Sequence, residues 1–185
     1  MEKEITQHPT DSLRIVLYGP ESTGKTTLAR ALAAQYDTAW VQEFARDYLQ
    51  KKWDDKQEVC SKDDLLIIAK KQIQLENKAL ERANKFLFCD TNILVTRVWS
   101  ETHFGGYCHP QIKKWSEEWK YDYYFLTDID VPWEADDLRD RPNNRQEMLS
   151  YFESVLQMNN YPYSYLSGSH EIRMKTVETL LKTLK

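Results

Sequence analysis

The eight residues from Gly19 to Thr26 constrain this chain more than any other segment. They read Gly-Pro-Glu-Ser-Thr-Gly-Lys-Thr, a complete GxxxxGK[ST] motif, and they follow an aliphatic run at 13–18 that is typical of a buried parallel strand. Residues 26–34 are rich in helix formers, so the motif has the strand, loop and helix context that it requires. We therefore expect a loop that binds nucleotide phosphates at the N-terminus of a helix.

The positions of this phosphate loop have separate chemical roles. Backbone N–H groups of a loop with Gly at both ends can face phosphate oxygens, while Lys25 reaches the β- and γ-phosphates. The hydroxyl of Thr26 is the expected Mg²⁺ ligand. The predicted phosphate-binding residues are Gly19, Glu21, Ser22, Thr23, Gly24, Lys25, Thr26 and Thr27.

Length and charge narrow the class of protein. The chain has 185 residues, which favours one domain at 13–185 after a flexible N-terminal arm at 1–12. Its net charge of −4 disfavours a nucleic-acid partner, so we expect a small-molecule substrate. No apolar run reaches the ~20 residues of a membrane span, and residues 1–9 lack a signal-peptide core. We expect a cytoplasmic protein without a membrane partner. Whether the chain forms a homo-oligomer is left open.

Helical and strand patterns alternate along the chain. This alternation predicts an α/β fold with a five-stranded parallel sheet and helices on both faces. Because ligands bind beyond the carboxyl ends of such strands, residues at these ends are the candidates for chemistry. The predicted strands are 13–18, 38–42, 86–90, 121–126 and 162–167, and the predicted helices are 26–34, 43–49, 61–83, 93–104, 111–120, 146–158 and 170–184.

Two carboxylates stand at predicted strand ends. Asp90 ends an apolar run and is a candidate for holding Mg²⁺ or for contacting the substrate; alternatively it helps to cap the helix that begins at Asn92. Glu43 is a candidate to accept the proton of an attacking hydroxyl, and its alternative is a solvated residue at a helix start. Arg46 and Asp47, one turn further, are suited to positioning a substrate, or else they form a surface ion pair.

The segment 132–145 mixes three arginines with four acidic residues. Arginine binds phosphate oxygens in a planar fork, so this composition favours a lid, although an ordinary solvated loop has a similar composition. We expect Arg139 to act on the transferred phosphoryl group and Arg141 to bind nucleotide phosphates. The aromatic residues that suit stacking on a planar ligand, or alternatively core packing, are Trp40, Tyr48, Trp99 and Trp133.

With these residues in view, residues 13–170 resemble the ribosylnicotinamide kinase domain of the NadR family, within the P-loop kinases. The resemblance is carried by the phosphate loop and by the segments 40–48, 88–92 and 132–139. It implies a P-loop kinase fold and phosphorylation of the 5′-hydroxyl of nicotinamide riboside, with ATP and Mg²⁺ as cofactors and nicotinamide mononucleotide as product. The implied catalytic residues are Lys25, Glu43, Asp90 and Arg139, the implied substrate-binding residues are Trp40, Glu43, Arg46, Asp47, Tyr48, Asp90 and Asn92, and the implied Mg²⁺ ligands are Thr26 and Asp90.

The chain departs from this family in two respects. Bifunctional members carry an adenylyltransferase domain before the kinase, and some carry a DNA-binding domain; we expect neither here. The family segment commonly reads Trp-Glu-Tyr-Gly-Arg-Asp-Tyr, whereas Trp40 is followed here by Val-Gln-Glu-Phe-Ala-Arg-Asp-Tyr. The identity of the base therefore stays open between two carboxylates. Alternatives for function are a kinase for another nucleoside or small alcohol and a nucleotide-binding regulatory ATPase.

Overall fold

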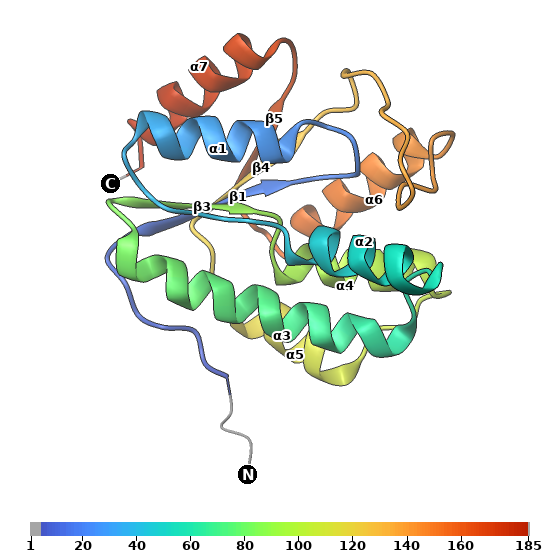
Figure 1. Cartoon of the computed structure of the whole chain (residues 1–185). Coiled ribbons are helices and arrows are strands. Elements are labelled where there is room, and N and C mark those ends of the chain that lie inside the picture. Colours follow the sequence, from blue (N-terminus) through green and yellow to red (C-terminus); the bar gives the residue numbers. More distant parts are fainter. Residues whose placement is uncertain (1–4, 185) are drawn as a thin grey trace.

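A five-stranded parallel sheet forms the centre of the molecule (Figure 1), in a computed structural model that describes residues 5–184. The strand order is β2-β3-β1-β4-β5, so β1 lies in the middle and the phosphate loop leaves the sheet at its centre. This architecture confirms the predicted α/β fold. The strands are β1 (Leu13–Tyr18), β2 (Trp40–Val41), β3 (Phe86–Asp90), β4 (Tyr123–Thr127) and β5 (Tyr163–Leu166).

Helices cover both faces of the sheet because the residues of β1 are apolar on both sides. Ile15 and Leu17 pack against α1 and α7, whereas Val16 and Tyr18 pack against α4 and α6 (Figure 1). All four side chains are fully buried, as expected for the central strand of a parallel sheet. The helices are α1 (Lys25–Gln35), α2 (Phe44–Lys56), α3 (Lys62–Ala79), α4 (Ile93–His103), α5 (Pro110–Glu118), α6 (Arg145–Met158) and α7 (His170–Leu181), with one 3-10 turn at Leu80–Arg82.

Two strands differ from the sequence prediction. The predicted strand 38–42 contains two strand residues, Trp40 and Val41, because it is an edge strand that pairs on one side with β3 and then turns toward α2. β4 begins two residues later than predicted. There the Asp122 carboxylate accepts a hydrogen bond from the backbone N–H of Arg14 (2.7 Å), so Asp122 binds the start of β1 instead of extending β4.

Residues 5–12 of the N-terminal arm are attached to the domain. The backbone N–H of His8 donates to Asn77 Oδ1 (3.0 Å), and Asn77 Nδ2 donates to the carbonyl of Thr6 (2.8 Å). Gln7 and the backbone of Lys120 exchange two further hydrogen bonds of 2.7 and 2.9 Å. The predicted flexible arm thus contacts the domain at residues 6–8, and residues 1–4 lie outside the described part of the chain.

Glu76 of α3 has a fully buried carboxyl group beneath the sheet. We expect this group to make the stability of the fold depend on pH. Burial raises its pKa to about 8, although Tyr121 Oη donates a hydrogen bond to Oε2 (2.8 Å) and the nearby charge of Arg14 opposes the shift. The folded chain thus holds a proton that an unfolded carboxyl, with a pKa near 4.5, has released. The resulting stabilisation is present below pH 4.5 and is lost as pH rises toward 8.

We expect Glu76→Gln, which resembles the protonated form, to remove this part of the pH dependence. Urea unfolding at pH 6 and pH 9 measures it, and the variant should lose less stability between these two values than the unaltered chain does. An identical loss in both proteins would mean that Glu76 is already ionised in the fold.

Within residues 5–184, no helix combines the length and apolar composition needed to cross a bilayer.

Candidate active site

The phosphate loop leaves β1 in a tight, internally bonded conformation. Gly19 has φ 137°, and a Cβ there would lie 2.8 Å from Thr127 Oγ1, so a side chain does not fit. Thr23 Oγ1 donates to the carbonyl of Pro20 (2.9 Å) and lies 2.6 Å from Thr127 Oγ1. Gly24, with φ 81°, is the N-cap of α1 in the left-handed region that favours glycine. Contacts with Thr127 of β4 therefore hold the loop in this conformation without a ligand.

Asp90 lies beside the phosphate loop because β1 and β3 are paired in register, with Leu17 opposite Asp90. Its Oδ2 accepts a hydrogen bond from Thr26 Oγ1, and the residue is fully buried. Among residues 5–184, Asp90 Oδ1 has no hydrogen-bond partner. A buried, unpaired carboxylate oxygen beside a hydroxyl is a donor set that suits Mg²⁺, so both predicted metal ligands fit the ion.

Glu43 occupies the N-cap position of α2, but its side chain makes no capping hydrogen bond and lines the cavity. Burial raises its pKa to about 7, and the nearby charge of Asp90 raises it further, against the effect of Lys25. Burial also raises the pKa of Asp90 and lowers that of Lys25, whose Nζ donates to the carbonyl of Pro20. Such shifts cluster at catalytic sites, and a carboxyl with a pKa near 7 is suited to accepting a proton.

A cavity of about 400 Å³ extends from the phosphate loop toward the helices. All eight phosphate-binding residues predicted in the loop line it: Gly19, Glu21, Ser22, Thr23, Gly24, Lys25, Thr26 and Thr27. In Glu21, burial and then the charge of Asp140 raise the pKa to about 6. Trp99 and His103 stack at the far end, with ring centroids 4.0 Å apart and planes 12° apart. The other residues of this mainly apolar end include Leu49, Cys60, Leu65, Ile68, Val95, Met148 and Phe152.

The predicted lid connects β4 to α6 without helix or strand, and it lies against the phosphate loop. The backbone N–H of Glu134 donates to Ser22 Oγ (2.9 Å), and Arg145 Nη2 donates to the carbonyl of Ser22 (3.0 Å). The sequence placed Arg145 in the lid but did not identify this contact. The segment 132–145 therefore has the position expected of a lid.

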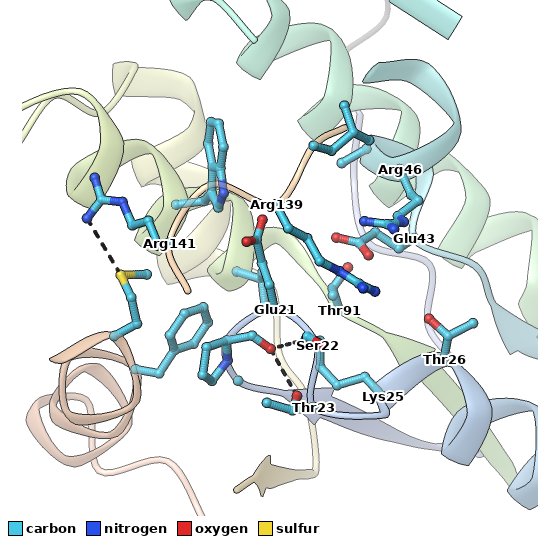
Figure 2. A pocket seen from close by; sticks show the side chains of 18 of the residues that line it. Glu21, Ser22, Thr23, Lys25, Thr26, Glu43, Arg46, Thr91, Arg139 and Arg141 are labelled. Carbon is cyan, nitrogen blue, oxygen red and sulfur yellow. Dashed lines mark hydrogen bonds between the residues drawn. The ribbon is translucent and has the colours of Figure 1, made fainter. Parts of the chain in front are cut away.

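Arginines from the lid and from α2 meet over the loop. Figure 2 shows the side chains of Arg46 and Arg139 directed toward Glu43, above Lys25. Asp136 forms an ion pair with Arg46, and its Oδ2 lies 3.4 Å from Arg139 Nε. The two cations are thus gathered where a terminal phosphate would lie, and one lid carboxylate contacts both.

Arg141 lies elsewhere in the cavity wall. Its Nη2 donates to the carbonyl of Thr102 (2.9 Å), and its Nη1 lies 4.0 Å from the sulfur of Met148. Figure 2 shows the side chain directed away from the phosphate loop. In this structure the guanidinium group of Arg141 is held by the α4 carbonyl, and its predicted role in binding ATP phosphates stays a prediction.

Three residues predicted to bind substrate, Trp40, Asp90 and Asn92, lie outside the cavity lining. Trp40 packs against the apolar cluster beneath α1 and α7. Asn92 is fully buried: its Oδ1 accepts a hydrogen bond from the N–H of Val95 (3.3 Å), and its Nδ2 donates to Tyr124 Oη (3.3 Å). Asn92 thus caps α4, which leaves the neighbouring Asp90 free of this role.

The side chains of Asp47 and Tyr48 also lie outside the cavity lining. Asp47 is exposed and accepts a hydrogen bond from Gln42 Nε2 (2.9 Å), while Tyr48 Oη donates to Asp64 Oδ1 of α3 (2.8 Å). Helical spacing explains this outcome, because Glu43 and Arg46 share one side of the first turn while these residues point elsewhere. The structure therefore brings Glu43 and Arg46, but not Asp47 or Tyr48, to the site.

Arg173 of α7 is a residue near the site that the sequence did not identify. It is 3% exposed, and its Nη1 donates to the carbonyl of Thr23 in the phosphate loop (2.6 Å). Its other nitrogens donate to the carbonyls of Gly168 and Asp128, both at 3.2 Å, and it pairs with Asp130. Since a trans peptide directs its C=O and N–H groups oppositely, holding the Thr23 carbonyl also orients the next N–H.

We expect Arg173→Met to weaken binding of an ATP analogue about tenfold, because one charge-assisted hydrogen bond to the loop is lost. Equilibrium titration with AMP-PNP measures the effect, and thermal unfolding reports any loss of stability separately. Arg173→Lys, which keeps the positive charge, is the matched control. Its affinity for AMP-PNP should lie between that of Arg173→Met and that of the unaltered protein. A lower Tm with unchanged nucleotide affinity would limit Arg173 to a structural role.

Comparisons with known proteins agree with this fold. The family model AAA_28, described as an AAA domain, matches residues 14–173. The trifunctional NAD biosynthesis/regulator protein NadR of Escherichia coli is 28% identical over 151 residues, which cover 80% of this chain and 37% of that protein. The corresponding protein of Salmonella typhimurium is 27% identical over 154 residues, covering 82% of this chain and 37% of its own length.

Solved structures share the fold. A NadR protein in complex with NR superposes with a TM-score of 0.72 at 21% identity, covering 93% of this chain and 51% of that one. Thymidylate kinase from Candida albicans has a TM-score of 0.68 at 15% identity, with 94% and 92% covered. The chain thus spans about 37% of the length of the curated NadR relatives and half of the NadR structure. The predicted resemblance to NadR is confirmed: the chain has a P-loop kinase fold, is homologous to NadR and belongs to the AAA_28 family of AAA domains.

Proposed function

We propose that this chain is a kinase that transfers the γ-phosphoryl group of ATP to the 5′-hydroxyl of nicotinamide riboside, with Mg²⁺ as cofactor. The observation that carries the proposal is Glu43, a carboxylate in the cavity whose pKa is raised to about 7, beside the phosphate loop. The relatives support the acceptor: NadR is named for NAD biosynthesis, and one NadR structure contains NR. Another contains NAD and AMP-PNP.

The residues have complementary roles in this reaction. Lys25 and the loop N–H groups hold the β- and γ-phosphates, while Thr26 and Asp90 would hold Mg²⁺. The ion, when bound, neutralises charge on the phosphate oxygens. Glu43 accepts the proton of the acceptor hydroxyl as that oxygen attacks, and the adjacent Arg139 stabilises charge on the phosphoryl group.

The far end of the cavity suits the base of a nucleoside. Its lining is mainly apolar, and the flat face of the stacked Trp99 and His103 pair can contact a planar ring. Burial and then the charge of Arg141 lower the pKa of His103, which favours the neutral form of this ring. A cavity of about 400 Å³ lies within the range that small-molecule sites occupy.

Formation of nicotinamide mononucleotide by the purified protein tests the proposal. The protein is incubated with ATP, Mg²⁺ and nicotinamide riboside, and product is followed by liquid chromatography against a reaction without acceptor. A panel of ribonucleosides and deoxynucleosides in competition tests specificity. Transfer to a different nucleoside would correct the acceptor, whereas ATP hydrolysis unaffected by any acceptor would favour a regulatory ATPase.

A further inference from the structure

Gln72 of α3 binds the backbone on both sides of Glu43. Its Oε1 accepts a hydrogen bond from the N–H of Phe44 (2.9 Å), and its Nε2 donates to the carbonyl of Gln42 (3.3 Å). The side chain is 2% exposed and reaches the cavity wall from below the sheet. Both polar groups of this buried amide are therefore used on the two residues that flank the candidate base.

These contacts supply hydrogen bonds to backbone groups that follow the end of the edge strand β2. β2 ends at Val41, so the next backbone groups have no neighbouring strand to bind on the α3 side. Buried backbone groups require partners, and a carboxamide offers the same donor and acceptor pair as a peptide group. Gln72 thus takes the place of a neighbouring strand for the segment 42–44.

The Glu43 carboxylate is not used as a helix cap. The residue at an N-cap usually accepts a hydrogen bond through its side chain from the N–H at the second or third helical position. Glu43 makes no such bond, and Gln72 binds the N–H of Phe44, the first residue of α2. With the carbonyl before Glu43 and the N–H after it both held, the backbone of Glu43 is fixed at φ −66° and ψ 106°.

We propose that Gln72 is a positioning residue for catalysis: it holds the backbone on both sides of Glu43 so that the Glu43 carboxylate faces the acceptor hydroxyl. This inference rests on the proposed phosphoryl transfer. It assigns Gln72 a role through the two backbone groups that its amide binds, and no contact with the acceptor. Gln72 therefore affects the rate of the chemical step and not the binding of either substrate.

Gln72→Met tests the proposal, since it keeps the side-chain length and removes both hydrogen bonds. We expect kcat to fall about tenfold or more, with the KM values for ATP and acceptor changed less than about twofold. Asn77→Leu is the matched control: Asn77 is a nearly buried amide of the same helix that holds backbone groups of the N-terminal arm instead. It should lower Tm and leave kcat unchanged.

A double-mutant cycle with Glu43→Gln shows whether Gln72 acts through Glu43. We expect Gln72→Met to have little further effect on kcat when Glu43 is already replaced. Three results would overturn the proposal: an unchanged kcat in Gln72→Met, a raised acceptor KM with kcat retained, or an equal loss of kcat in both backgrounds. The second result would mean that the Gln72 amide contacts the acceptor directly.

A crystal structure of Gln72→Met separates this inference from the proposed function. If Gln72 positions Glu43, the segment 42–44 should shift and the Glu43 carboxylate should leave the cavity. An unchanged segment overturns the inference, whatever the activity. If the unaltered protein transfers no phosphoryl group to any acceptor, the proposed function is wrong, and this structure still decides whether Gln72 determines the placement of Glu43.

Discussion

Lys25→Ala is expected to abolish phosphoryl transfer, with kcat falling at least about 10³-fold. Lys25 is the first residue of α1, and its side chain lies across the phosphate loop to the carbonyl of Pro20. Burial lowers its pKa, but the adjacent charges of Glu43 and Asp90 oppose that shift and favour the charged form. Without this cation, the charge on the transferred phosphoryl group has no counter-charge inside the loop.

Single-turnover transfer from labelled ATP measures this loss directly. Lys51→Ala is the matched control, because Lys51 is an exposed lysine of α2 that forms an ion pair with Asp55. The control should keep the activity of the unaltered protein. If Lys25→Ala retained more than a tenth of kcat, the charge over the β- and γ-phosphates would have to come from the arginines instead.

Glu43→Gln is expected to lower kcat about 10²-fold and to change the pH dependence of kcat/KM. Since burial raises the pKa of Glu43 to about 7 in the free protein, its carboxylate form predominates above pH 7 and its protonated form below. In the unaltered protein, kcat/KM should therefore rise with pH between about 6 and 8, because this ratio reports ionisation in the free protein. The residual activity of Glu43→Gln should lack this rise, because an amide does not titrate there.

Asp90→Asn separates the two carboxylates that the sequence left open as the base. Asp90 contacts Thr26 and is a proposed Mg²⁺ ligand, so its replacement should raise the Mg²⁺ concentration needed for half-maximal rate. Glu43→Gln should leave that concentration unchanged. Rates measured across Mg²⁺ concentrations and pH distinguish the roles, and the reverse pattern would make Asp90 the base.

Local sequence predicted the parts of this site that lie within continuous segments. The phosphate loop, β1 and β3 were predicted at their observed bounds, because a glycine-flanked loop and an apolar run each determine their own conformation. The prediction that Asn92 binds substrate shows the limit of this approach. Asn92 lies two residues from Asp90, but the chain turns there into α4, and its side chain is used as the cap.

Contacts between distant elements could not be predicted in this way. Gln72 and Glu43 are brought together by the packing of α3 under the edge of the sheet, and Arg173 reaches Thr23 from the far end of the chain. Neither residue belongs to a recognisable motif, and both appear in sequence as ordinary polar positions of amphipathic helices. What identifies them is burial combined with hydrogen bonds to backbone groups beside functional residues.

The lid carboxylate Asp136 bears on how this site responds to ionic strength. It already contacts Arg46 and Arg139, so a nucleotide phosphate that binds these arginines replaces one anion with another. Such an exchange releases fewer salt ions than the neutralisation of two bare cations. Nucleotide affinity would then vary weakly with salt concentration. Between turnovers, the charge of the two arginines would be balanced by a protein carboxylate rather than by mobile counterions.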